Sequence, residues 1–218
     1  MKRLSCVTLL LVCLGAQSQG AEIRVRASDD EGRPLADVVV SADRVGAGGR
    51  SKEAAPVNGE RPTATIAQID KQFVPYVTAI RVGTAVTFPN YDEILHNVYS
   101  FSRAKTFQLP LYKDTSPEPV VFGEPGVVVL GCNIHDWMVA YVYVLETPWF
   151  SKTTSEGRAT LEVPPGEYLV EVRHPRRNRR ASTPARELRL QEGARAELEF
   201  RVTLKPEWRP ERKPERGR

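Results

Sequence analysis

Residues 131–138 read G-C-N-I-H-D-W-M, and the rest of the chain can be understood as a scaffold that presents this stretch. Cys132, His135 and Met138 follow one another at intervals of three residues, so a short loop can turn all three side chains toward one point. Another histidine, His96, lies far upstream in L-H-N-V-Y. These residue types are rare, with 3 Cys, 3 His and 2 Met in 218 residues. Their grouping therefore indicates a shared chemical role.

A thiolate, two imidazoles and a thioether are the donor set of blue-copper electron-transfer sites, in which Met is a weak axial ligand. Soft sulfur favours Cu(I), and imidazole suits copper in general. The sequence therefore predicts one type 1 copper ion held by His96, Cys132, His135 and Met138. The alternative is a buried cysteine, a core methionine and two surface histidines, because Cys and Met are common in protein cores.

The same residue counts exclude other metal chemistries. Three histidines are too few for a multicopper oxidase, and the one methionine outside the N-terminal segment is too few for a Met-rich copper chaperone. A structural zinc site usually has more Cys or His, and a catalytic zinc site keeps a position open for water. Four donors from the protein leave copper closed to substrate, so we expect an electron carrier and not an enzyme.

The N-terminus has the three parts of a secretory signal peptide. Residues 1–3 are basic at positions 2 and 3, residues 7–14 are apolar, and residues 15–21 are small and polar, with cleavage expected near Gly20. The apolar run is too short for a permanent membrane span. We therefore expect residues 1–21 to be removed and the mature protein to be periplasmic. Acylation of Cys13, as in a lipoprotein, is the alternative.

Export changes the interpretation of the cysteines and of the charge. Cys6 and Cys13 would leave with the signal peptide, so Cys132 would be unpaired in a compartment where disulfides form. Metal ligation explains an unpaired cysteine there, and an intermolecular disulfide is the alternative. Loss of Lys2 and Arg3 lowers the formal net charge from +4 to +2, and we expect no nucleic-acid partner.

Short apolar runs and frequent turns predict an all-β protein. Ile23, Val25 and Ala27 alternate with arginines, which is typical of a half-buried strand. Residues 46–62 show no periodicity and are interpreted as a linker and domain boundary, and residues 108–119 as a polar, proline-bearing connection. Further strands are expected over residues 37–42, 64–68, 77–82, 84–88, 120–122, 127–130, 139–145, 159–163, 168–172 and 196–204.

Residues 63–146 resemble the cupredoxins, or plastocyanin-like proteins. The matching stretches are F-V-P at 73–75, V-G-T-A-V-T-F-P-N at 82–90, H-N-V at 96–98, E-P-G at 124–126 and the ligand loop, whose spacing is that of amicyanin. The resemblance implies a Greek-key β-sandwich over residues 60–146 with His96, Cys132, His135 and Met138 as copper ligands. It also implies that Asn97 hydrogen-bonds the two ligand loops together. The arrangement further resembles plastocyanin-like proteins labelled "methylamine utilization protein".

The ligand loop departs from the cupredoxin pattern at two places. Gly131 stands where an aromatic residue is common before the cysteine, and Asp136-Trp137 replace a proline-bearing pair. Because of these departures, the resemblance does not predict the redox potential or the recognition surface. It still predicts copper as the metal.

The flanking sequences resemble the carboxypeptidase-regulatory-like, or transthyretin-like, β-sandwich. The first half matches residues 30–42 and the second half matches residues 155–172. Because two strands alone are marginally stable, we expect residues 22–58 and 147–204 to form one sandwich. The cupredoxin domain would then be inserted between its second and third strands, with the aromatics of T-P-W-F at 147–150 packing between the domains.

Two C-terminal features have simple interpretations. Residues 173–180, R-H-P-R-R-N-R-R from Arg173 to Arg180, are expected to form a solvated loop, and a docking patch for an acidic partner or an anionic membrane surface is the alternative. His174 has no second metal ligand near it in the sequence. Residues 205–218 repeat P-E-x-x units and are predicted to be disordered.

Together these features predict an exported copper protein that passes single electrons between periplasmic protein partners. Electrons would cross at the ring edge of His135, and Ile134 and Trp137 would form an apolar docking patch, with ordinary loop packing as their alternative. Two other functions remain open: copper binding or sequestration without fast electron transfer, and a structural or sensory adaptor that works through the transthyretin-like sandwich.

Overall fold

The computed structural model describes residues 20–46, 49–50, 61–114, 117–178 and 180–206. Every strand or helix assigned within these residues is a β-strand, and no segment of them forms a helix with the length and apolar character needed to cross a membrane. The predicted all-β class is confirmed. The predicted signal peptide up to residue 19, most of the 46–62 linker and the tail from residue 207 lie outside the described residues.

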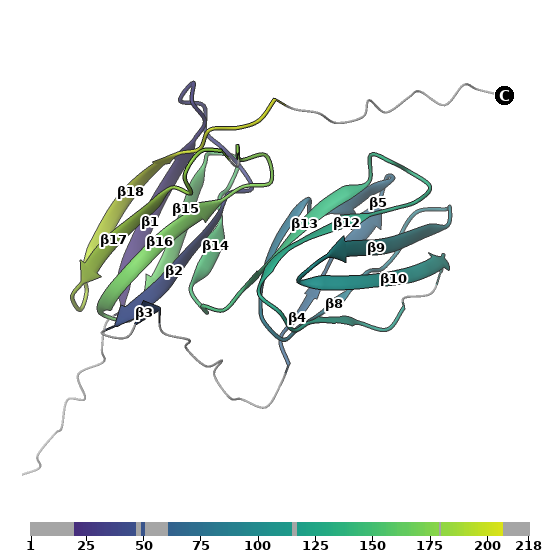
Figure 1. The fold of residues 1–218 in the computed structure, drawn as a ribbon, viewed down its shortest axis with the longest axis horizontal. Coiled ribbons are helices and arrows are strands. Elements are labelled where there is room, and N and C mark those ends of the chain that lie inside the picture. Colours follow the sequence, from purple (N-terminus) through teal and green to yellow (C-terminus); the bar gives the residue numbers. More distant parts are fainter. Residues whose placement is uncertain (1–19, 47–48, 51–60, 115–116, 179, 207–218) are drawn as a thin grey trace, which may run out of the picture.

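Strands from two distant parts of the chain build the outer sandwich, drawn in purple, green and yellow in Figure 1. One sheet has the order β15-β1-β18, and the other has the order β14-β2-β16-β17 with β3 paired to β2. These strands are β1 (Ala21–Ser28), β2 (Val39–Gly46), β3 (Gly49–Arg50), β14 (Phe150–Lys152), β15 (Arg158–Val163), β16 (Gly166–Arg173), β17 (Ala185–Leu190) and β18 (Arg195–Arg201). Both N-terminal strands thus depend on partners that follow residue 149.

The alternation predicted for the first strand is confirmed. In β1, Ile23 and Val25 are buried between the two sheets, whereas Arg24 and Arg26 face outward. Burial of an aliphatic side chain of this size contributes about 1.5–3 kcal/mol. Those contributions require the facing sheet, which includes Val170 of β16, so neither half of the outer sandwich has a complete core alone.

The middle of the chain forms a second sandwich, drawn in teal in Figure 1. Its sheets have the orders β10-β9-β12-β13-β7 and β11-β8-β4, with a separate β5-β6 hairpin. The strands are β4 (Thr63–Thr65), β5 (Ala67–Ile69), β6 (Gln72–Val74), β7 (Val77–Arg81), β8 (Thr84–Thr87), β9 (His96–Ser102), β10 (Lys105–Tyr112), β11 (Val120–Phe122), β12 (Gly126–Gly131) and β13 (Val139–Leu145). The predicted fold class, one β-sandwich inserted into another, is therefore confirmed.

β10 corrects the expectation that residues 108–119 form an irregular connection. The strand covers Lys105–Tyr112 and contains Pro110, which cannot donate a hydrogen bond to a neighbouring strand. Two features accommodate this proline: β10 lies at the edge of its sheet, and the ladder with β9 shifts register between Leu109 and Tyr112. β14 and β17 were also not predicted, because their exposed and short sequences carry little periodic signal.

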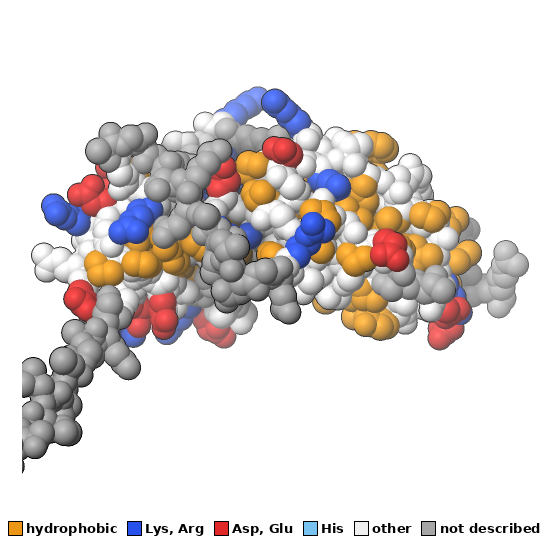
Figure 2. All heavy atoms as spheres, turned by 90° about the horizontal axis from the view of Figure 1, so that it is seen from below, with side chains coloured by type: hydrophobic (Ala, Val, Ile, Leu, Met, Phe, Trp, Pro, Cys, Tyr) orange, Lys and Arg blue, Asp and Glu red, His pale blue; other side chains and the backbone are white. Residues whose placement is uncertain are grey.

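The two sandwiches meet in a small hydrophobic cluster of their own. Its buried members are Val39, Val77, Tyr143 and Leu145. Beside it, the Lys152 ammonium donates to the carbonyl oxygen of Val77 at 2.9 Å and pairs with Asp37 at 2.8 Å. This lysine links the outer sandwich to β7 of the inserted one. Figure 2 shows the same molecule from below, with hydrophobic side chains interspersed with charged ones along this face.

The aromatics of the T-P-W-F stretch divide between two places. Phe150 packs at the junction cluster. Trp149 instead packs in the core of the outer sandwich, where its ring centroid lies 5.4 Å from that of Tyr168. The expectation that these aromatics pack between the domains thus describes Phe150 and not Trp149.

The pairing of strands predicts how truncation acts. A chain that ends at Glu146 loses β14 to β18, so β1 and β2 lose all their partners except β3. We expect the N-terminal strands of this fragment to unfold while residues 60–146 keep a cooperative transition and dispersed amide resonances. Amide hydrogen exchange on the fragment, followed by NMR, measures the protection of the N-terminal strands and of the inserted sandwich separately. Protection of residues 21–46 in the truncated chain would contradict the insertion.

Candidate metal centre

Two chain segments meet at one end of the inserted sandwich. β9 begins at His96, and β12 ends at Gly131, immediately before Cys132. The two strands are antiparallel neighbours, paired at Tyr99 and Gly131. In an antiparallel pair the start of one strand lies beside the end of the other. Residues 36 positions apart in the sequence thereby become neighbours in space.

Three of the four predicted ligands have their donor atoms in one cluster. One nitrogen of His96, one nitrogen of His135 and the sulfur of Cys132 all lie within 4.8 Å of one another. The Sγ of Cys132 lies 3.9 Å from Nδ1 of His96, and the two imidazole centroids lie 5.0 Å apart. Donors at about 2.0 Å (nitrogen) and 2.3 Å (sulfur) from one metal ion lie at most about 4.3 Å apart. The Cys132–His96 separation therefore fits a shared ion.

Met138, the fourth predicted ligand, is buried at the same end of the sandwich. It belongs to the same hydrophobic core cluster as Cys132 and directly precedes β13. Its backbone N–H donates to the carbonyl oxygen of His135 at 2.9 Å, which closes the end of the ligand loop into a turn. Met138 is thus a buried thioether in the same core cluster as Cys132, at the end of the ligand loop.

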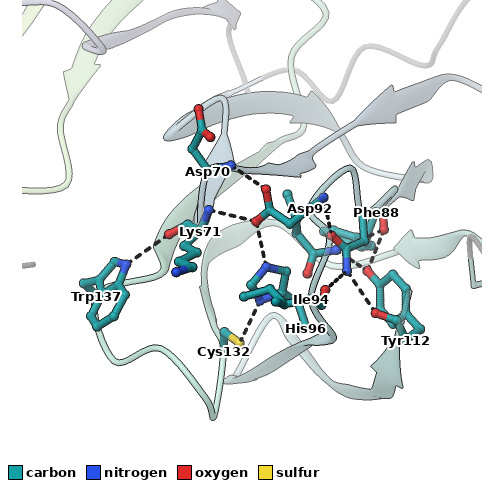
Figure 3. A network of polar contacts seen from close by, with 11 residues as sticks. Asp70, Lys71, Phe88, Asp92, Ile94, His96, Tyr112, Cys132 and Trp137 are labelled. Carbon is teal, nitrogen blue, oxygen red and sulfur yellow. Dashed lines mark hydrogen bonds and ion pairs between the residues drawn. The ribbon is translucent and has the colours of Figure 1, made fainter. Parts of the chain in front are cut away.

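His96 is held by a carboxylate that the sequence reasoning missed. The Nε2 of His96 lies 2.7 Å from Oδ2 of Asp92, and Figure 3 shows the ring between this carboxylate and Cys132. A hydrogen bond from Nε2–H to the carboxylate fixes the tautomer and leaves the lone pair of Nδ1 facing the thiol. A histidine oriented in this way is ready to bind a metal through Nδ1. The signal in the sequence was an aspartate four residues before the histidine.

Asp92 is in turn fixed by the hairpin between β5 and β6. Its carboxylate accepts the backbone N–H groups of Asp70 at 2.6 Å and Lys71 at 2.8 Å. Burial disfavours the ionised form, but hydrogen bonds from Lys71, His96 and Asp70 outweigh it and hold the pKa of Asp92 below its ordinary value. Asp70 and Lys71 both have positive φ, as a two-residue type I′ hairpin turn requires. This backbone conformation turns both N–H groups toward Asp92.

The segment before His96 is closed by a second set of bonds. The side chain of Asn90 donates to the carbonyl oxygen of Ile94 at 2.9 Å and to that of Tyr112 at 3.0 Å. Its own Oδ1 accepts the backbone N–H of Asp92 at 2.9 Å. One amide therefore sets the path of the chain from Asp92 to the start of β9.

The ligand loop is anchored on both sides of Cys132. Oδ1 of Asn97 accepts the backbone N–H of Asn133 at 2.9 Å, which is the bond between ligand loops that the cupredoxin resemblance implied. The indole N–H of Trp137 donates to the carbonyl oxygen of Lys71 at 3.1 Å (Figure 3). Lys71 thus contacts both ligand segments, through Asp92 on one side and Trp137 on the other.

The donors differ in their access to solvent. His96 is fully buried, whereas His135 retains 9% exposure and packs against Trp137 with ring centroids 5.1 Å apart. Ile134, next to His135, is 49% exposed. Trp137 is only partly exposed, because its ring packs against His135 and the inserted core. His135 is therefore the imidazole nearer to solvent.

Gly131, which departs from the cupredoxin pattern, is explained by Tyr99. A Cβ atom at position 131 would lie 2.7 Å from Cζ and 2.8 Å from the hydroxyl oxygen of Tyr99. The Tyr99 ring also packs against Phe101, with centroids 5.2 Å apart. An aromatic side chain from the neighbouring strand therefore covers the position before the cysteine, and only glycine fits beneath it.

Comparison with known proteins gives partial similarities in structure only. No protein-family model and no curated protein matches the chain. The Cu(I) form of one amicyanin mutant aligns with 38% of this chain and 82% of its own at 20% identity and a TM-score of 0.36. The Cu-containing nitrite reductase (NirK) from Thermus scotoductus SA-01 aligns with 48% of this chain and 25% of its own, at 26% identity and a TM-score of 0.36. Similarity at this level does not define a family for the chain.

The contact of Gly131 with Tyr99 predicts strong coupling between the two positions. We expect Gly131→Phe to lower the free energy of unfolding by about 1–3 kcal/mol, because the new side chain and the tyrosine ring require the same space. Adding Tyr99→Ala should recover most of that loss. Denaturant unfolding of the two single variants and the double variant measures the coupling.

A matched control for this cycle is Gly123→Phe, because Gly123 has open space around its Cβ position. It should change stability by less than Gly131→Phe and should show no coupling to Tyr99. If the effects of the substitutions at positions 131 and 99 on the free energy of unfolding are additive, the two side chains do not compete for the same volume and the prediction is wrong.

Proposed function

We propose that this chain is an exported type 1 copper protein that carries single electrons between protein partners in the periplasm. The observation that carries the proposal is the buried cluster of one thiol and two imidazole nitrogens within 4.8 Å. His96, Cys132, His135 and Met138 would hold the ion. Copper, when bound, supplies a one-electron Cu(II)/Cu(I) couple.

The donor chemistry favours copper over zinc and electron transfer over catalysis. Thiolate and thioether sulfur select soft Cu(I), and a weak axial methionine beside a His, His, Cys plane is typical of blue-copper sites. Zinc in catalytic sites keeps an open position, whereas four protein donors would leave none here. The protein would therefore act as a carrier and not as an enzyme.

The surrounding bonds would keep the ligands in place when the oxidation state changes. Asp92 fixes the ring of His96, Asn97 ties the two ligand segments together, and Trp137 anchors the loop after Cys132. Ligands held by such outer hydrogen bonds keep their orientation. Small rearrangement of the protein favours rapid gain and loss of one electron.

The exposed end of the ligand loop suits contact with a partner. His135 is the less buried imidazole, and the exposed side chain of Ile134 adjoins it. Ile94 and Leu95, which precede His96, are also exposed and apolar. We propose that electrons cross at the edge of His135 and that Ile134, with the exposed part of Trp137, belongs to an apolar docking surface.

Export is supported by the N-terminal sequence and by the state of the cysteine. Cys132 is buried and unpaired. An intermolecular disulfide needs an accessible sulfur, so burial disfavours that alternative. A metal ligand that is unpaired and shielded is consistent with a periplasmic location.

The metal proposal is tested by replacing the sulfur donor. Full-length protein loaded with Cu(II) should show the intense blue charge-transfer band of a copper–thiolate site, and Cys132→Ser should abolish it. The substitution removes the thiolate but nearly preserves volume, so the apo unfolding transition should change little. A colourless wild-type protein, or a zinc complex that copper does not displace, would refute the assignment.

The carrier proposal is separated from copper sequestration by the reduction potential and by self-exchange. A carrier should titrate reversibly and exchange electrons quickly with itself. Asp92→Asn should raise the potential, because the loss of the anion beside His96 disfavours Cu(II). Asp136→Asn is the matched control: it removes an exposed charge from the same loop and should shift the potential much less. Equal shifts would show that Asp92 acts only through net charge.

A further inference from the structure

A cavity of about 220 Å³ lies where the inserted sandwich meets the basic run of the outer one. Val127, Tyr141 and Tyr143 line it from β12 and β13, and residues between Arg173 and Thr183 line it from the β16–β17 connection. Sites for drug-sized ligands occupy about 300–1,000 Å³, and one water molecule takes up about 30 Å³. The cavity therefore has room for one small ion with a few waters.

Hydrogen-bond donors line this cavity on both sides. Tyr143 is only 4% exposed, and it lines the cavity. Burial raises the pKa of Tyr143 above its ordinary value, so the phenol keeps its proton. Nδ1 of His174 accepts the backbone N–H of Arg176 at 3.2 Å, and burial lowers the pKa of His174 to about 4. The ring is thus neutral near pH 7, with its proton on Nε2.

The two arginines of the cavity differ in how their charges are balanced. Arg173 pairs with Glu171 at 2.6 Å and donates to the hydroxyl of Ser41 at 2.7 Å. Nη1 of Arg177 donates to the carbonyl oxygen of Ala181 at 2.7 Å, and no acidic residue among those described pairs with it. The carbonyl fixes the guanidinium plane and leaves Nη2 and Nε for another acceptor.

The residues that line the cavity include two arginines and, within the part of the chain that the structure describes, no acidic side chain. The Coulombic influence of both Arg173 and Arg177 reaches Tyr143, and that of Asp37 reaches His174. Hydrogen-bond donors and a guanidinium with no acidic partner among the described residues therefore line the same cavity.

We propose that this junction cavity binds a small free oxyanion of the phosphate class. Guanidinium groups bind such ions through charge-assisted hydrogen bonds, and Arg177 supplies a planar donor of this kind. Tyr143, Tyr141, Thr183 and His174 can complete the set of donors around the oxygens. The bound ion touches both sandwiches and links them. This site does not depend on copper binding.

The test uses full-length, metal-free protein and inorganic phosphate as the probe. Calorimetric titration at constant ionic strength, set with potassium chloride, should give one saturable site, and phosphate should raise the unfolding temperature more than chloride does. Arg177→Gln should weaken binding at least about tenfold, and Tyr143→Phe should weaken it several-fold, because each removes a donor to the ion. If Arg177→Gln does not fold, Thr183→Val tests the proposal in its place, because it also removes a hydrogen-bond donor that lines the cavity.

The matched control is Arg189→Gln, since Arg189 lies on β17 outside the cavity and its side chain is 82% exposed. It removes the same charge and should leave the phosphate affinity unchanged within about twofold. Equal weakening by Arg177→Gln and Arg189→Gln would overturn the proposal, because binding would then follow net charge. Binding to anionic phospholipid vesicles without binding of free phosphate would also overturn it and would assign the basic run to a membrane surface.

Discussion

The carboxylate of Asp92 is the interaction on which the candidate metal centre depends. It accepts the ring N–H of His96 and two backbone N–H groups from the hairpin turn at Asp70 and Lys71. A carboxylate that is partly removed from water stays ionised more readily where such donors surround it. Each partner therefore fixes the others, and Nδ1 of His96 faces Cys132 at 3.9 Å. A metal ion held by these residues would need little further ordering of His96, because its ring is already oriented by outer hydrogen bonds.

β13 connects this site to the rest of the molecule. It begins directly after Met138, and within seven residues it contributes Tyr143 and Leu145 to the junction with the outer sandwich. A strand paired on both sides, here with β12 and β7, moves as part of its sheet. The outer sandwich and the ligand loop are thus joined by one continuous, hydrogen-bonded element. A ligand or partner that acts at the junction therefore has a short structural route to Met138.

How much the sequence predicted depended on whether the signal was local. The alternation in β1 and the spacing of Cys132, His135 and Met138 are local, and they predicted a strand and a ligand loop. Asp92 was missed because its role comes from a hairpin turn some twenty residues upstream, as the bond to Lys71 shows. The edge strand β10 was missed because its proline is tolerated only at an edge, and edge position follows from pairing across the sheet. Long-range contacts account for both of these failures.

Gly131 shows why a departure from a family pattern has to be judged in space. In sequence, an aromatic residue is missing before Cys132. In the folded chain, the ring of Tyr99 lies where a side chain at position 131 would begin. Tyr99 of β9 covers this position from the neighbouring strand, across the pair formed by Tyr99 and Gly131. Packing over position 131 therefore has room for the side chain of Tyr99 or for one at position 131, but not for both.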